Sequence, residues 1–296
     1  DVQDIISKIF SKNMAIEKGL YLVSTPIGNV NDITVRAIKI LNCSDTIVCE
    51  DTRVSKKLFS HLGLPVQKKK WLIYNDHSNS KDITKVLNEL DKDKVISLIS
   101  DAGTPLISDP GYKLIKRIKQ SRHNIFSLPG PCSAIASLII SGLKTDKFSF
   151  LGFLPKNKSD YIGTIRDYAK LNCSLIIYEK PKRLIFFLEV IRENFKFFKL
   201  AIVKELSKLY EDFFFITEEN IDSFLKTPKK VRGELTIIAE LSDSDKKIYS
   251  DQEIIDELKK LKPSQVSAML SKSSSQSRNI LYKRCMDLLN ENFLKK

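Results

Sequence analysis

The sequence is poor in the residues on which disulfide-linked, zinc-binding and membrane proteins depend. Only 5 of the 296 residues are cysteine, none of them in a Cys-x-x-Cys pair, and only 3 are histidine. A disulfide framework and a metal site are therefore not expected, and unclustered thiols are typical of the reducing cytoplasm. No apolar run approaches the roughly 18 residues of a membrane helix, and the N-terminal segment lacks the pattern of a signal peptide. We expect a cytoplasmic protein with no metal and no membrane contact.

Negative charge is scarce relative to positive charge. Lysine and arginine number 49 against 36 aspartates and glutamates, which leaves a net charge of +13. A basic excess favours an anionic partner such as nucleic acid. Lysine alone supplies 39 of the 49 cations, a bias that genome composition also produces. Charge alone therefore leaves nucleic-acid binding and compositional bias equally open.

The length corresponds to about two domains of roughly 150 residues each. Strand-like apolar runs alternate with helical patterns, which is typical of an α/β protein. The last segment has no strand signal, two helical patterns, and 11 Lys or Arg against 6 Asp or Glu from Lys246 onward. We predict four parts: an N-terminal extension (1–17), an N-terminal α/β domain (18–131), a C-terminal α/β domain (132–245) and a basic helical tail (246–296).

Four segments with polar or turn-forming residues follow predicted strands, where α/β folds bind ligands. They are Ser24–Asn29, Glu50–Arg53, Ser100–Gly111 and Pro129–Ala134. None has the glycine spacing of a dinucleotide or phosphate loop, and each has a structural alternative. The first is an ordinary turn, and the second a solvated charged loop. Asp109 and Pro110 form the N-cap and first residue of a helix, and Ser133 caps the next helix. Asp101 has no such capping role and is free to face a ligand.

Taken together, these segments resemble the tetrapyrrole methylase superfamily. Within it, they are similar to the branch that methylates a cytidine 2′-oxygen in 16S rRNA. The matching strings are TPIGN (25–29), EDTR (50–53), SDAGTPLISDPGY (100–112), PGPCSA (129–134), GFLP (152–155), Tyr178-Glu179 with Arg183, KELSK (204–208) and RGE (232–234). In the tail, NILYK (279–283) is similar to the branch's helical end. Lys204 and Ser207 stand where that branch usually has arginine and threonine.

The resemblance implies two α/β domains with a cleft between them that binds S-adenosylmethionine. Carried over string by string, the expected cofactor-binding residues are Pro26, Ile27, Thr104, Ile107, Ser133, Ala134, Tyr178, Val203 and Glu234. The implied partners are 16S rRNA in the small ribosomal subunit and a second copy of the chain.

A 2′-hydroxyl is a weak acid, so a base or a cation near it speeds its attack on the methyl group. Our first choices for this role are Asp101, Glu50 and Lys204. The sequence does not separate them from Asp51, His77, Glu179 and Glu205.

Two other functions remain open. A C-methyltransferase of a corrin or porphyrin precursor would share the superfamily, but the TPIGN and SDAGTPLISDP strings and the basic tail argue against it. A basic RNA-binding protein without activity would not need the cofactor strings, which are intact.

Overall fold

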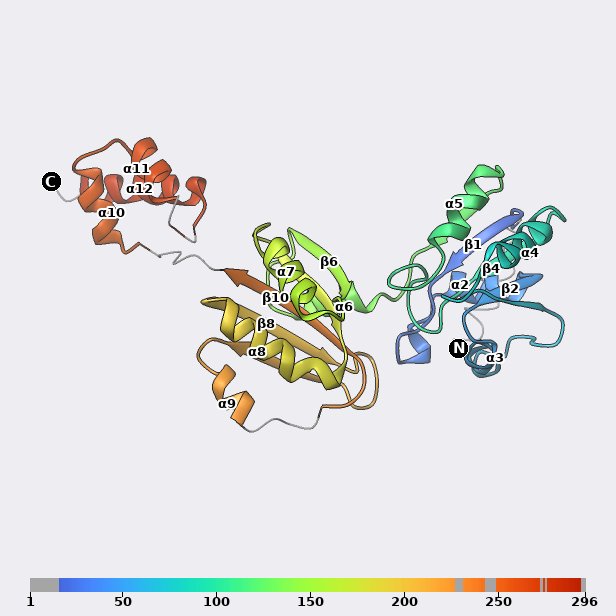
Figure 1. Cartoon of the computed structure of the whole chain (residues 1–296). Helices are drawn as coiled ribbons and strands as arrows, with labels where there is room; N and C mark the ends of the chain where they lie inside the picture. Colours follow the sequence, from blue (N-terminus) through green and yellow to red (C-terminus); the bar gives the residue numbers. More distant parts are fainter. Residues whose placement is uncertain (1–15, 227–230, 243–248, 272–273, 275, 294–296) are drawn as a thin grey trace, which may run out of the picture.

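The computed structural model describes residues 16–226, 231–242, 249–271, 274 and 276–293. Most of the predicted N-terminal extension lies outside these residues, and so do residues 243–248, where the predicted C-terminal domain meets the predicted tail. Figure 1 shows two α/β units side by side and a helical unit at the C-terminal end.

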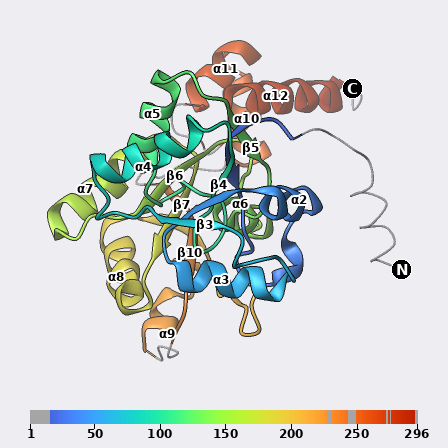
Figure 2. The ribbon, with the colours of Figure 1, turned by 90° about the vertical axis from the view of Figure 1, so that its right-hand side faces the viewer.

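The first unit is a parallel sheet with the strand order β3-β2-β4-β1-β5. The central strands are short apolar runs with both faces buried, which is typical of a parallel sheet covered by helices. Helices α2 and α3 pack on one face and α4 and α5 on the other (Figure 2). The strands are β1 (Gly19–Val23), β2 (Thr46–Cys49), β3 (Lys70–Ile73), β4 (Val95–Leu98) and β5 (Ile125–Leu128). The helices are η1 (Val30–Asp32), α2 (Val35–Cys43), α3 (Thr52–His61), α4 (Ser80–Leu90) and α5 (Tyr112–Gln120).

The second unit is a mixed sheet with the order β6-β7-β10-β8-β9, in which only β6 and β7 are parallel. Helix α6 packs on one face, while α7, α8 and α9 pack on the other. The strands are β6 (Phe148–Phe153), β7 (Ser174–Glu179), β8 (Phe197–Lys204), β9 (Asp212–Thr217) and β10 (Leu235–Ser242). The helices are α6 (Ser133–Ile140), α7 (Lys158–Ala169), η2 (Pro181–Arg183), α8 (Leu184–Asn194) and α9 (Ile221–Lys226).

The described residues of the tail form three helices, whereas the sequence predicted two helical patterns. They are α10 (Asp251–Leu258), α11 (Pro263–Leu270) and α12 (Arg278–Phe293). Pro263 is the first residue of α11, a position where its fixed φ and missing N–H cost nothing. The first of the two predicted helical patterns therefore corresponds to two helices, α10 and α11. They share with α12 a small core of their own, which contains Ile254, Val266 and Leu281.

The predicted fold class is confirmed: two α/β units are followed by a helical appendage. The predicted domain limits stay predictions. β5 ends at Leu128 and α6 begins at Ser133, on either side of the predicted boundary. In the described part of the chain, no helix combines the length and apolarity needed to cross a membrane.

Candidate active site

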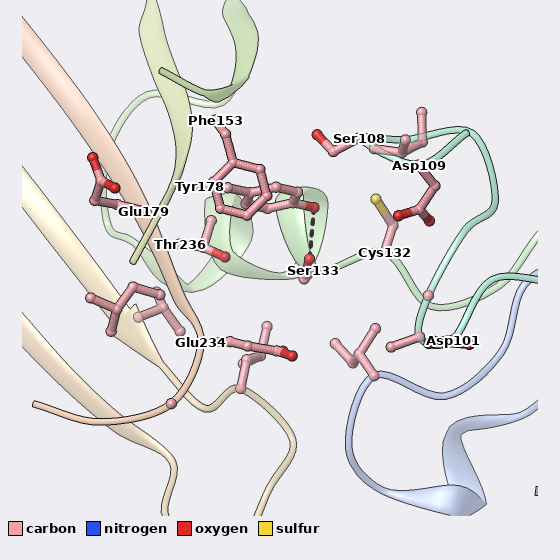
Figure 3. A pocket seen from close by; sticks show the side chains of 18 of the residues that line it. Asp101, Ser108, Asp109, Cys132, Ser133, Phe153, Tyr178, Glu179, Glu234 and Thr236 are labelled. Carbon is pink, nitrogen blue, oxygen red and sulfur yellow. Dashed lines mark hydrogen bonds between the residues drawn. The ribbon is translucent and has the colours of Figure 1, made fainter. Parts of the chain in front are cut away.

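A cavity of about 400 Å³ lies between the two sheets. The first sheet contributes the loops after β1, β2, β4 and β5, because the carboxyl ends of its parallel strands share one edge. The second sheet contributes the ends of β7 and β8 and the start of β10, which are adjacent in its register. Segments far apart in the sequence therefore form one cavity (Figure 3).

Nine of the twelve predicted site residues line this cavity. They are Ile27, Glu50, Asp101, Thr104, Ile107, Ser133, Tyr178, Val203 and Glu234. The other three are close in sequence to lining residues but are not part of the lining. Ala134 is buried and packs in the core beneath α6, and Pro26 lies between the buried Thr25 and the lining Ile27. Lys204 follows Val203 on β8, and consecutive side chains of a strand point to opposite faces.

The long loop after β4 is tied to its neighbours by hydrogen bonds. The backbone N–H of Thr25 donates to the carbonyl of Gly103 at 2.9 Å, and the reverse bond is 3.1 Å. The hydroxyl of Thr104 donates to the carbonyl of Pro131 at 2.8 Å. Leu106 and Ser108 have φ values of 72° and 62°, a strained conformation for residues with a Cβ. The three loops thus form a single wall of the cavity.

Carboxylates gather on this wall. Burial, together with the nearby carboxylates of Asp109 and Asp101, raises the pKa of Glu50 from 4.5 to about 7. Burial also raises the pKa of Asp109 to about 6, with Asp101 and Asp76 adding to the effect. The pKa of Asp101 is also raised above its usual value, again mainly by burial. The charged neighbours that raise these pKa values are themselves carboxylates, so the wall favours a cationic ligand.

The predicted capping role of Asp109 is wrong. Helix α5 begins at Tyr112 with Gly111 as its N-cap, and no side chain caps it. Asp109 lies two residues too early and faces the cavity instead (Figure 3). An aspartate shortly before a helix often accepts hydrogen bonds from the first backbone N–H groups of that helix, which is why the sequence predicted a cap. The sequence does not show that the loop turns Asp109 away from the helix.

The opposite wall is built from hydroxyl and aromatic groups. The hydroxyl of Ser133 lies 2.7 Å from the phenolic oxygen of Tyr178. Burial raises the pKa of Tyr178, so the ring stays neutral. Phe153 contacts it with ring centroids 5.6 Å apart. The predicted capping by Ser133 is wrong, because Cys132 is the N-cap of α6 and makes no side-chain bond.

Three of the four remaining candidate bases form hydrogen bonds or ion pairs with other side chains. Glu179 lines the cavity, but its carboxylate accepts a 2.7 Å hydrogen bond from Tyr161 and points away from the centre. Asp51 caps α3 and pairs with Arg53 at 2.6 Å. Glu205 pairs with Lys208 at 3.0 Å. His77 is exposed and is not in the lining.

Sequence reasoning missed several lining residues, although most lie inside the matched strings. They include Ser108, Asp109, Cys132, Phe153, Leu206 and Thr236. Thr236 is opposite both Tyr178 and Val203 in the sheet register. If the strand order had been known, the predicted residues Tyr178 and Val203 would have identified Thr236, because β10 lies between their two strands. The order of the strands cannot be derived from the sequence. In the described part of the chain, no group of three or more His, Cys, Asp or Glu side chains is arranged to hold a metal ion.

Comparisons with known proteins agree with this arrangement. Residues 19–222 match the family model of the tetrapyrrole (corrin/porphyrin) methylases. The chain is 41% identical over 227 residues to ribosomal RNA small subunit methyltransferase I of Rickettsia prowazekii, covering 76% of this chain and 79% of that one. It is 31% identical to the protein of the same name from Mesorhizobium japonicum, covering 92% and 93%.

Solved structures show the same fold. Uroporphyrin-III C-methyltransferase of Thermus thermophilus, complexed with S-adenosylhomocysteine, superposes with a TM-score of 0.51 at 16% identity, covering 74% of this chain and 96% of that one. The family match spans most of the chain, and the named relatives are matched over most of their length. The chain therefore belongs to the tetrapyrrole methylase family and, within it, to the family of ribosomal RNA small subunit methyltransferase I.

Proposed function

We propose that this protein transfers a methyl group from S-adenosylmethionine to the 2′-oxygen of a cytidine in 16S rRNA of the small ribosomal subunit. The observation that carries the proposal is a cavity whose carboxylate wall includes Glu50, with a pKa of about 7. The names of the relatives supply the substrate class.

The residues of the cavity fit the cofactor. S-adenosylmethionine carries a positive sulfonium and a positive ammonium group, and Glu50, Asp101 and Asp109 form an anionic wall for them. Its adenine and ribose need apolar contact and hydroxyl partners, which Ile27, Val203 and the hydroxyls of the opposite wall supply. A solved structure with this fold contains the demethylated product, which supports the same cofactor here.

When bound, the cofactor supplies a methyl group already activated by the sulfonium, so no metal is required. Glu50 accepts the proton of the attacking 2′-hydroxyl, and its pKa near 7 suits a base that works at neutral pH. Asp101 faces the same space and orients the bound groups. The hydrogen-bonded loops hold these carboxylates in place, and such alignment supplies several kcal/mol. Lys204 is not in the lining, so we assign the base to Glu50 instead, and the role of Lys204 stays a prediction.

The basic charge of the chain then serves rRNA binding. A net charge of +13 attracts the phosphate backbone, and this total includes the helical tail, which has 11 cations against 6 anions. Its helices lie outside the cavity lining, so the tail engages rRNA rather than the cofactor. Methylation of ribosomal subunits places the protein in the cytoplasm.

Two copies of the chain form a homodimer. On the face of the second sheet that α6 covers, Phe213 and Phe215 are each 42% exposed and Ile139 is 68% exposed. Exposed apolar groups of this kind on one face are typical of a protein interface.

One experiment separates the proposal from its alternatives. The purified protein is incubated with labelled cofactor and either unmethylated small subunits or a tetrapyrrole precursor, with and without a chelator. We expect label on 16S rRNA in both conditions. Label on the tetrapyrrole would identify a C-methyltransferase. Subunit binding without any label would identify an inactive RNA-binding protein. Loss of label in the presence of the chelator would identify a metal-dependent enzyme.

A further inference from the structure

The loop that joins β8 to β9, residues 205–211, holds two large side chains in solvent. Leu209 is 89% exposed and Tyr210 is 71% exposed. Single exposed apolar residues are common on protein surfaces. An exposed leucine and tyrosine next to each other are different when their loop also contributes to a reaction cavity, as this loop does through Leu206.

The conformation of this loop is held in place by its own polar groups. Glu205 and Ser207 have φ values of 50° and 64°, which residues with a Cβ rarely adopt. The ammonium of Lys208 pairs with Glu205 at 3.0 Å and with Glu234 at 3.1 Å. The backbone N–H of Ser207 donates to Glu211 at 2.5 Å. Strained residues persist where the surrounding contacts fix them, and they cluster at ligand-binding sites.

The same loop is anchored to the other α/β unit. The hydroxyl of Ser207 donates to Asp32 and accepts from the backbone N–H of Asn29 at 3.3 Å. A Cβ at Gly28 would lie 2.6 Å from Cγ of Lys208, so only glycine allows this approach. The loop therefore bridges the two α/β units next to the cavity, and it holds Leu209 and Tyr210 exposed to solvent.

We propose that Leu209 and Tyr210 form a stacking platform for a nucleobase of single-stranded rRNA next to the target cytidine. This inference rests on the proposed function, because it names how the same cavity receives its substrate. The target ribose enters the cavity while its neighbours remain covalently attached outside the mouth. Proteins that read unpaired RNA stack its bases on aromatic side chains.

Charges across the cavity match a polyanion. Helix α3 begins two residues after Glu50 of the cavity lining. It exposes Arg53, Lys56 and Lys57 to solvent. The guanidinium of Arg53 pairs with Asp51, and the ammonium of Lys56 lies 5.6 Å from the centre of the Trp71 ring. An RNA strand whose phosphates lie along α3 and whose base stacks on Tyr210 matches both the exposed cations of α3 and the exposed aromatic ring.

A second copy of the chain is a poorer occupant of this platform. A stable interface buries roughly 1,200–2,000 Å² in total, whereas one aromatic side chain supplies roughly 150–250 Å². The dimer surface proposed above includes Phe213 and Phe215 of β9, beyond this loop, and the two side chains of the loop by themselves match the size of one nucleobase.

The test compares Tyr210→Ala with Tyr210→Trp and with Tyr168→Ala. Tyr168 is another exposed tyrosine, at the end of α7 and outside the cavity lining. Steady-state methylation of unmethylated small subunits gives KM and kcat, and filter binding gives subunit affinity. Calorimetry gives cofactor affinity, and thermal melting reports folding.

We expect Tyr210→Ala to raise KM for subunits and to weaken subunit binding roughly 5- to 100-fold, the range for losing one stacked base. Its kcat, cofactor affinity and melting temperature stay near the parent values. Tyr210→Trp keeps the affinity within about threefold, and Tyr168→Ala behaves as the parent. Leu209→Ala gives the same effect as Tyr210→Ala, but smaller.

Subunit affinity of Tyr210→Ala within twofold of the parent overturns the platform. So does a melting temperature that falls with the affinity in both Tyr210→Ala and Tyr210→Trp, because the side chain is then structural. A shift to monomers in sedimentation of Tyr210→Ala assigns the loop to a dimer contact instead. Filter binding needs no turnover, so the platform is judged even if the parent protein methylates nothing.

Discussion

The hydroxyl oxygen of Ser133 lies 2.7 Å from the phenolic oxygen of Tyr178. Ser133 begins α6, directly after the segment that leaves the first sheet, and Tyr178 lies near the end of β7. Both residues line the cavity. This contact fixes the start of α6 against the second sheet, so the wall opposite the carboxylates is formed before any ligand binds.

Tyr178→Phe tests this contact. The variant keeps the ring and its packing on Phe153 but removes the hydroxyl, which leaves Ser133 without that partner. One hydrogen bond is worth about 0.5–1.5 kcal/mol, so cofactor affinity falls about 2- to 10-fold in calorimetry. Tyr168→Phe, at an exposed site, is the matched control. Unchanged affinity in Tyr178→Phe would show that the hydroxyl does not support the cofactor site.

The pH dependence of turnover tests Glu50 as the base. A base must be deprotonated to act, and kcat/KM reports the free enzyme, so kcat/KM rises with pH through about 7, the pKa of Glu50. Glu50→Gln lowers the rate by about 10²–10⁴, the usual contribution of a general base, and removes this rise. A rise through pH 7 that persists in Glu50→Gln assigns the titration to another group, with Asp109 the first to examine.

Glu50 also affects stability in a direction that can be worked out. Its pKa in the folded protein is raised from 4.5 to about 7, so the folded state binds the proton more tightly than the unfolded state. The resulting stabilisation is full below pH 4.5 and is lost as the pH rises through about 7. Glu50→Gln therefore melts higher than the parent at pH 8.

The shift corresponds to at most about 3 kcal/mol, and solvent at the open cavity reduces this to about 1–2 kcal/mol, or several degrees of melting temperature. The difference between variant and parent shrinks toward pH 4.5. Equal melting temperatures of Glu50→Gln and the parent at pH 8 would mean that ionisation of Glu50 does not destabilise the folded protein.

Asp101→Asn tests the second carboxylate. The Asp101 carboxylate accepts the backbone N–H of Asp51 at 3.3 Å, and an amide oxygen can replace it there, so the fold is retained. Losing the charge costs a few kcal/mol of transition-state stabilisation, as for other preorganised polar groups. Turnover on small subunits at saturating cofactor therefore falls about 100-fold. A collapse in melting temperature would instead show that Asp101 only ties the loop to the Asp51 backbone.

Removal of the tail tests its separation from the cavity. A chain that ends at Lys247 loses the three-helix core around Ile254 and Val266 but keeps every residue of the cavity lining. We expect unchanged cofactor affinity by calorimetry and little activity on small subunits. Loss of cofactor binding from a folded truncation would contradict the assignment. Sedimentation of the same truncation tests the rival role, dimer formation.

Local sequence pattern was enough to predict that strands alternate with helices in both α/β units. The apolar runs Thr46–Cys49 and Val95–Leu98 are strands because residues buried on both faces of a parallel sheet need no polar positions. The spacing of Val86 and Leu90 puts both on one face of α4, where they are buried. These features depend on neighbours within a few residues, and such neighbours are visible in the sequence.

The site was harder to predict because its geometry depends on contacts between distant segments. Asp109 has the sequence environment of a helix cap, but the loop turns it into the cavity. Lys204 lies in a matched string, yet strand alternation puts it on the other face from Val203. Within the part of the tail that the structure describes, Pro263 starts a new helix inside what was predicted as a single helical pattern.

The sequence by itself determined the fold class, the family and the strings from which the cavity is built, because these follow from local periodicity and from residue identity. The tertiary structure alone decided which of those residues face one another. Glu50, Asp101 and Asp109 come from two loops and share one wall only because β2 and β4 are neighbours in the sheet. Their raised pKa values follow from that proximity and from burial. Neither proximity nor burial exists until the chain has folded.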